Sequence, residues 1–214
     1  MVGERRPRLI VVAGPNGAGK TSITEAVLRH QWMQGCEYIN PDNIARDLFG
    51  DWNSPDAVLK AATLAGERRD HCIEQRVDLA FETVLSSPDK VDFVLRAIER
   101  GFFVRLFYVC TASPTINAAR IAQRVLEGGH EVPIGKIISR YDKSIINCAQ
   151  LARVVDRLYV YDNSVDGAPP DLCFRARDGR MVRNYRTAPD WAQLIAGQLA
   201  AMIDTSFPAD KSQP

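Results

Sequence analysis

A glycine-rich segment near the amino terminus constrains the fold of this 214-residue chain more than any other feature. Residues Gly14–Thr21 read Gly-Pro-Asn-Gly-Ala-Gly-Lys-Thr, which matches the phosphate-binding pattern G-x-x-x-x-G-K-[ST]. The apolar run Leu9–Ala13 comes directly before this loop, and Lys20–His30 after it reads as a helix. A buried strand, a phosphate loop and a helix in this order predict an α/β fold of the P-loop NTPase class.

The residue types in the loop suit the binding of ATP or GTP with Mg²⁺. Glycines let the backbone wrap a phosphate closely and turn its N–H groups inward. Lys20 would neutralise the β- and γ-phosphates, and Thr21 would be a ligand of Mg²⁺. The predicted nucleotide-binding residues are Gly14, Pro15, Asn16, Gly17, Ala18, Gly19, Lys20, Thr21 and Ser22. This loop alone does not indicate kinase chemistry, because motor proteins and GTPases share it. The chain has no Asn-Lys-x-Asp segment of the kind that GTPases use to read the base.

The rest of the chain alternates strand-like and helix-like segments, which predicts a doubly wound parallel sheet. We expect one kinase-like domain over residues 1–204, a three-layer sandwich with a central five-stranded, mostly parallel sheet and helices on both faces. A hairpin through Asp178-Gly179 and a last helix from Trp191 to Met202 would follow, and residues 205–214 would form a disordered tail. The five expected strands are Leu9–Ala13, Glu37–Asn40, Val77–Glu82, Phe102–Val109 and Leu158–Tyr161.

Composition narrows the classes of partner and the compartment. With 27 basic and 26 acidic residues the net charge is +1, which argues against a long nucleic acid as the main partner. The five cysteines are scattered without metal-binding spacing, which favours reduced thiols in a cytoplasmic protein. No apolar run is long enough for a membrane span.

Two acidic residues follow expected strands, at the edge of the sheet where ligands bind in this fold class. Asp42 could accept the proton of an attacking hydroxyl group, or it could be the N-cap of a helical turn over Asn43–Phe49. The sequence of this segment alone favours neither interpretation over the other. Glu82 ends a strand that should be buried, which favours a role in binding substrate or the water shell of Mg²⁺ over a salt bridge in the core.

Basic residues after the fourth strand suggest a phosphate-contacting lid over residues 115–145. Arg120 and Arg124 lie four residues apart on one helix face, where an anion would offset their repulsion. A contact between Arg124 and Glu127 is the structural alternative. Arg140, on the basic face of the next helix, is a further candidate, although most such faces are only solvated. The link Gly128–Pro133 between the two helices reads as a hinge.

With these pieces in place, the chain resembles the zeta-toxin family of P-loop kinases between about Leu9 and Ser164. The resemblance lies in the segments Gly14–Ser22, Asn40–Asp42, Phe81–Thr83, Arg124–Pro133 and Tyr161–Ser164. It implies phosphorylation of a sugar hydroxyl on a nucleotide sugar such as UDP-N-acetylglucosamine, and a small helical antitoxin that blocks the nucleotide site.

The resemblance also implies roles for single residues. Lys20 matches the phosphate-loop lysine, Asp42 the general base and Arg124 a lid arginine, with Asn40, Glu82 and Thr83 on the substrate side. A second lid arginine of the family falls at His130, which leaves Arg140 or Arg120 as substitutes.

Two other hypotheses remain. One is a kinase for another hydroxyl compound, such as an antibiotic or a nucleoside-like metabolite. The other is a nucleotide-dependent binding protein with little catalysis, which would have no use for a base at Asp42.

Overall fold

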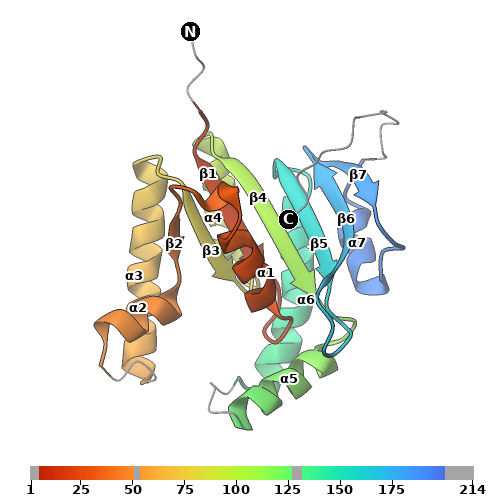
Figure 1. Cartoon of the computed structure of the whole chain (residues 1–214), viewed down its shortest axis with the longest axis horizontal. Coiled ribbons are helices and arrows are strands. Elements are labelled where there is room, and N and C mark those ends of the chain that lie inside the picture. Colours follow the sequence, from red (N-terminus) through yellow and green to blue (C-terminus); the bar gives the residue numbers. More distant parts are fainter. Residues whose placement is uncertain (1–4, 51–53, 127–131, 201–214) are drawn as a thin grey trace.

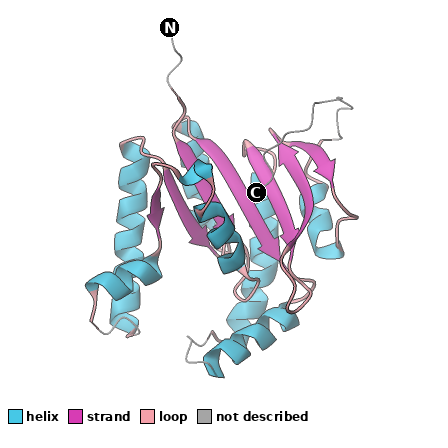
Figure 2. Cartoon of the chain, in the orientation of Figure 1, coloured by secondary structure: helices cyan, strands magenta, loops and turns pink. Residues whose placement is uncertain are grey.

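A seven-stranded sheet runs through the centre of the computed structural model, with helices packed against it (Figures 1 and 2). The structure describes residues 5–50, 54–126 and 132–200. The strand order is β2-β3-β1-β4-β5-β6-β7, and the first five strands are parallel. These five are β2 (Glu37–Ile39), β3 (Leu79–Thr83), β1 (Arg8–Ala13), β4 (Phe103–Cys110) and β5 (Arg157–Asp162). This confirms the expected mostly parallel α/β sheet.

The expected sheet of five strands is too small, because the C-terminal hairpin adds two more. β6 (Asp171–Arg177) pairs antiparallel with β5, and β7 (Arg180–Asn184) pairs with β6. The Asp178-Gly179 turn that the sequence predicted joins them, with positive φ at both residues. Without the hairpin, β5 would leave a row of backbone N–H and C=O groups unpaired, and β6 satisfies them.

Helices cover both faces of the sheet, but unevenly (Figure 1). One face carries α1 (Lys20–Leu28) and a short 3₁₀ helix, η1 (Gln31–Met33). The remaining helices contribute to the core on the other face, except α5, which extends from the carboxyl end of β4. The helices with residues in this core are α2 (Pro41–Leu48), α3 (Pro55–Glu74), α4 (Pro88–Glu99), α6 (Ile134–Leu151) and α7 (Gln193–Ala196), and the excepted helix α5 spans Pro114–Leu126.

After Arg8, the central strand β1 is apolar because both of its faces are buried. Leu9 and Val11 pack toward α4 and α6, whereas Ile10 and Val12 pack toward α1, where they meet Ile23 and Val27. None of these β1 side chains is more than 3% exposed. A continuous apolar run is the pattern expected of such a strand, and it places the phosphate loop at the centre of the sheet edge.

The C-terminal helix is shorter than the sequence suggested. A 3₁₀ turn, η2 (Asp190–Ala192), leads into the single turn of α7, which Gly197 follows. Trp191 and Ile195 are buried in the core. The chain then runs beside the hairpin, where the N–H of Ala200 donates to the carbonyl of Gly179 at 3.0 Å. Met202 and the expected tail at 205–214 lie outside the described residues.

Two expectations drawn from composition can be compared with the structure. The five cysteines carry free thiols, four of them buried. Across the described ranges, the helices lack the combination of length and apolarity that a bilayer span requires.

Candidate active site

The phosphate loop joins β1 to α1 through glycines that no other residue could replace without strain. Gly17 and Gly19 have φ values of 77° and 88°, in the left-handed region. A Cβ on Gly17 would lie 2.5 Å from the carbonyl oxygen of Asn117, and one on Gly19 would lie 2.1 Å from Nδ2 of Asn163. The loop is therefore held tightly between the starts of α5 and of the segment after β5.

Hydrogen bonds fix the backbone of the phosphate loop at further positions. The carbonyl of Pro15 accepts the N–H of Ala18 at 3.2 Å, and the carbonyl of Ala18 accepts Nδ2 of Asn163 at 2.9 Å. At Gly14 the N–H donates to the carbonyl of Thr83 at 3.2 Å, which fastens the loop to the end of β3. Oδ1 of Asn16 is buried and has no hydrogen-bond partner among the described residues. A buried oxygen of this kind suits a ligand that brings a donor.

Lys20 is folded back over the loop that precedes it. Its ammonium donates to the carbonyl oxygens of Gly14 and Pro15, at 3.0 and 3.1 Å. The pKa of Lys20 is lowered from 10.5 to about 8, mainly by burial; the negative charge of Glu82 opposes this shift, and the positive charge of Arg124 contributes to it. The structure thus brings Lys20, Glu82 and Arg124 within electrostatic range of one another. An anionic phosphate beside the ammonium would stabilise its charged form.

The start of α1 fits a nucleotide phosphate. Its N-cap is Gly19, which offers no side chain, so the first N–H groups of the helix have no side-chain partner. Thr21 and Ser22 are exposed in this first turn. The described residues contain no cluster of three or more His, Cys, Asp or Glu side chains that could hold a metal. Mg²⁺ in kinases takes few protein ligands and completes its shell with phosphate oxygens and water, so the hydroxyl of Thr21 suits it.

On the acceptor side, the structure corrects one of the two interpretations of Asp42. The N-cap of α2 is Asn40, whose Oδ1 accepts the N–H of Asp42 at 2.8 Å. The helix also starts at Pro41 rather than at Asn43, because proline is well suited to the first helical position. Asp42 therefore lies in the first turn of α2, is exposed, and is not the cap. The interpretation of Asp42 as the cap is therefore wrong, and its role as a base stays a prediction.

Glu82 lies near the carboxyl end of β3 and is held by a neighbouring strand. The hydroxyl of Tyr38 donates to Oε1 of Glu82 at 3.1 Å, and Nδ2 of Asn40 donates to the Tyr38 oxygen at 3.0 Å. Burial, and then the negative charge of Glu82, raise the pKa of Tyr38 well above its usual value. Sequence reasoning missed Tyr38, because its contact depends on the pairing of β2 with β3.

Thr83 does not join this group. Alternation along β3 directs it to the face opposite Glu82, and its hydroxyl oxygen accepts the N–H of Leu85 at 3.0 Å. The next turn is held by α6, since Ser144 donates to the carbonyl of Val84 at 2.7 Å and Asn147 to that of Leu85 at 2.9 Å. Thr83 therefore shapes the loop after β3, and its contact with a substrate stays a prediction.

The three candidate arginines have different surroundings. Arg124 is exposed on α5 and acts on Lys20 by its charge. Arg120 instead fastens the segment after β5: it donates to the carbonyls of Asn163 at 2.8 Å and Val165 at 3.3 Å. Arg140 is half-buried on α6 and has no ion pair within the described residues. Phosphate contacts of Arg120 and Arg140 stay predictions, and Glu127 and His130, like most of the Gly128–Pro133 link, lie outside the described residues.

The second residue that the sequence did not assign to the site is Asn163. It connects the loop carbonyl of Ala18 to the segment that Arg120 holds, so α5, β5 and the phosphate loop form one hydrogen-bonded unit. The available signal was a polar residue directly after a buried strand.

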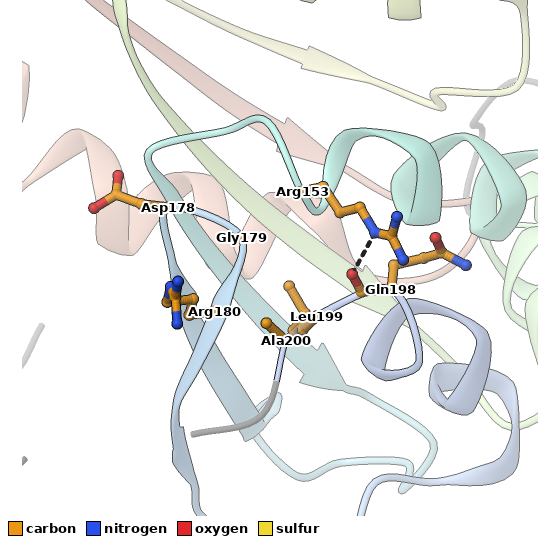
Figure 3. A pocket seen from close by; sticks show the side chains of 7 residues that line it. All are labelled: Arg153, Asp178, Gly179, Arg180, Gln198, Leu199 and Ala200. Atoms are coloured by element: carbon orange, nitrogen blue, oxygen red, sulfur yellow. Dashed lines mark hydrogen bonds between the residues drawn. The ribbon is translucent and has the colours of Figure 1, made fainter. Parts of the chain in front are cut away.

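One hollow of about 320 Å³ lies far from these residues (Figure 3). It is at the β6–β7 turn, and Arg177 next to that turn pairs with Arg157, at the amino end of β5. The candidate active site is at the other end of the parallel strands. The hollow is lined by Arg153, Asp178, Gly179, Arg180, Gln198, Leu199 and Ala200.

Comparison with known proteins adds a family and several similar folds. The family model described as "Zeta toxin" matches residues 1–167. An uncharacterized protein of Haemophilus influenzae is 29% identical over 134 residues, which are 63% of this chain and 92% of that protein.

Among solved structures, a chain of the AvrRxo1-ORF1:AvrRxo1-ORF2 complex with sulphate ions is similar with a TM-score of 0.64 and 18% identity. The match covers 90% of this chain and 63% of that one, so this chain spans less than two thirds of its length. The same complex with ATP matches equally well. A chain of the PezAT toxin-antitoxin system of Streptococcus pneumoniae has a TM-score of 0.57 and 16% identity, covering 92% of this chain and 79% of that one. At such low identity these structures establish the fold alone.

Proposed function

Because this chain belongs to the zeta toxin family and has a P-loop kinase fold, we propose that it transfers the γ-phosphate of ATP or GTP to a hydroxyl group of a nucleotide sugar, such as UDP-N-acetylglucosamine. The chemistry is mostly positioning and charge stabilisation, because phosphoryl transfer passes through a loose transition state.

The donor side of the proposal is supported by the fit of the phosphate loop. The uncapped start of α1 and the ammonium of Lys20 would bind the β- and γ-phosphates. Thr21 would hold Mg²⁺, which when bound neutralises charge on the transferring phosphate. Arg124 is the side chain that we assign to the charge that develops during transfer, since its own charge already reaches Lys20. A structure of the similar AvrRxo1-ORF1:-ORF2 complex was determined with ATP.

The observation that carries the acceptor side is the position of Asp42. Its carboxylate is exposed at the edge of the sheet that holds the phosphate loop, and Asn40 relieves it of a capping role. It is therefore available to take the proton of an acceptor hydroxyl as that oxygen attacks phosphorus. Asn40 and Glu82 lie on the same side and offer oxygen and nitrogen atoms for the hydroxyl groups of a sugar.

The test is incubation of the protein with labelled ATP, Mg²⁺ and a panel of nucleotide sugars, with free sugars, nucleosides and hydroxylated antibiotics as further arms. We expect label on UDP-N-acetylglucosamine and none with Lys20→Ala. Label on another hydroxyl compound alone would retain the kinase and reject the nucleotide sugar. Nucleotide binding without transfer to any acceptor would favour a binding protein.

We also propose that an antitoxin protein binds this chain. The support is the family match and the similarity to a chain of a toxin-antitoxin system. Expression of the chain alone should slow growth of the host, and expression of Lys20→Ala should not. Equal growth with both proteins would mean that the chain is not toxic, and the reason to expect an antitoxin would be lost.

A further inference from the structure

Strand pairing places an unassigned tyrosine beside the acceptor side of the site. Tyr38 on β2 pairs with Ala80 on β3, two residues before Glu82. Residues two apart on a strand share a face, so Tyr38 and Glu82 are diagonal neighbours across the two strands. A diagonal separation of this kind is within reach of an aromatic side chain. The register thus explains the hydrogen bond between the Tyr38 hydroxyl and Oε1 of Glu82.

The same hydroxyl is also held from the other side. Nδ2 of Asn40 donates to it at 3.0 Å, so the single phenolic proton is directed to Glu82. The raised pKa of Tyr38 keeps that proton in place at physiological pH. Oε1 of Glu82 is thereby occupied, and Oε2 has no hydrogen bond to a described residue.

Asn40 uses both ends of its amide. Its Oδ1 accepts the N–H of Asp42 at the start of α2, while its Nδ2 holds Tyr38. A continuous chain of hydrogen bonds therefore runs from Glu82 through Tyr38 and Asn40 to the backbone of Asp42. It connects the two carboxylates that the proposed function uses, although they come from separate elements of the chain.

We propose that Tyr38 is a positioning residue of the acceptor site, which turns Glu82 so that Oε2 faces the substrate hydroxyl and, through Asn40, fixes the spacing of Glu82 and Asp42. This inference rests on the proposed function. It assigns to Tyr38 no contact with the nucleotide and no part in proton transfer.

The first test is Tyr38→Phe, which removes one hydroxyl group and keeps the ring. We expect the KM for the acceptor to rise about tenfold, equivalent to about 1.4 kcal/mol, with the nucleotide Kd unchanged. The matched control is Tyr159→Phe: Tyr159 is buried on the same face of the sheet, and its hydroxyl has no hydrogen bond to a described residue. This control should leave the acceptor KM unchanged. An unaltered acceptor KM in Tyr38→Phe would overturn the proposal.

A double-mutant cycle separates positioning from a general structural role. If Tyr38 acts through Glu82, Tyr38→Phe should change the acceptor KM little once Glu82→Ala is present. An equal effect in both backgrounds would mean that Tyr38 acts on the fold, and would refute the positioning role.

A third measurement needs no acceptor and so distinguishes failure of this inference from failure of the proposed function. With ¹³C-labelled glutamate, the side-chain carboxyl resonance of Glu82, assigned through Glu82→Gln, should move in Tyr38→Phe and stay in Tyr159→Phe. A shift without turnover in the wild type would keep Tyr38 as the holder of Glu82 and reject the kinase. No shift would reject the role of Tyr38, whatever the protein phosphorylates.

Discussion

Replacing Asp42 with asparagine tests the proposed base while leaving the size of the side chain unchanged. Asp42 is exposed in the first turn of α2, and Asn40 already caps that helix. The substitution therefore removes only a negative charge near the positive end of a helix dipole. Such a charge contributes about 0.3–1 kcal/mol to stability. In a chain of this size we expect the melting temperature to fall by no more than about 2–4 °C.

The expected loss of turnover is much larger. A positioned general base contributes about 10²- to 10⁴-fold to the rate, which corresponds to roughly 2.7–5.5 kcal/mol of activation free energy. Nucleotide affinity should remain, because the carboxylate lies on the acceptor side. We would measure kcat by coupled ADP release at saturating acceptor, nucleotide Kd by titration, and the melting temperature by calorimetry.

The matched control is Asp47→Asn, which removes the same charge from an exposed position near the end of the same helix. It should leave kcat unchanged. If Asp42→Asn retains the turnover of the wild type, Asp42 is an ordinary first-turn acid. The chain would then lack the base that the kinase proposal needs, and the binding-protein hypothesis would be favoured.

Three further predictions concern the phosphate loop. Lys20→Ala should lower kcat by two or more orders of magnitude in the same assay, because the β- and γ-phosphates lose their fixed counter-ion; near-normal turnover would reject the loop assignment. Lys20→Met should be more stable than the wild type at pH 7, because burial opposes the charge of Lys20 and lowers its pKa from 10.5 to about 8. Between pH 8 and 10.5 the unfolded wild type binds more protons than the folded wild type, so its free energy of unfolding should rise with pH. The difference in free energy of unfolding between Lys20→Met and the wild type, measured by urea titration, should therefore narrow over this range. A constant difference would contradict the lowered pKa of Lys20. Gly19→Ala should lower the free energy of unfolding by about 1–3 kcal/mol, because its Cβ would lie 2.1 Å from Asn163 with φ at 88°. Gly135→Ala, in open space in the first turn of α6, should raise the free energy of unfolding by about 0.5–1 kcal/mol. Equal melting temperatures for the two variants would refute this prediction.

The parts of the fold that the sequence predicted are those encoded by local pattern. The apolar run before Gly14 has the pattern of a central strand, and Asp178-Gly179 between two strands has that of a tight turn. The addition of that hairpin to the main sheet depends on the free edge of β5, which no local pattern records. The last helix was overestimated because Leu194, Leu199 and Met202 extend an apolar spacing past Gly197, where α7 has ended.

For the site, too, the sequence predicted what local pattern encodes and missed what depends on contacts between distant segments. The phosphate loop and the positions of Asp42 and Glu82 follow from the placement of ligands at strand ends. The structure adds that Lys20 lies within electrostatic range of Glu82 and Arg124, and the roles of these residues stay predictions. Tyr38 was missed because its contact depends on how β2 pairs with β3, and pairing between distant strands is not written in either one. The contacts of Arg120 depend similarly on where the segment after β5 lies.

The two outer strands of the sheet, β2 and β7, have features that oppose pairing with strands of other chains. β2 has only three residues, too few to offer another strand a long row of free N–H and C=O groups. β7 is longer, but it carries Arg180 and Arg183, and its pairing with β6 shifts register between Arg175 and Ala176. Charge, shortness and irregularity are the means by which natural sheets discourage edge-to-edge aggregation. The start of β7 is also covered by the chain itself, because Arg180 forms a bridge with Ala200. Exchanging Arg180 and Arg183 for valine should therefore make the protein more prone to aggregate.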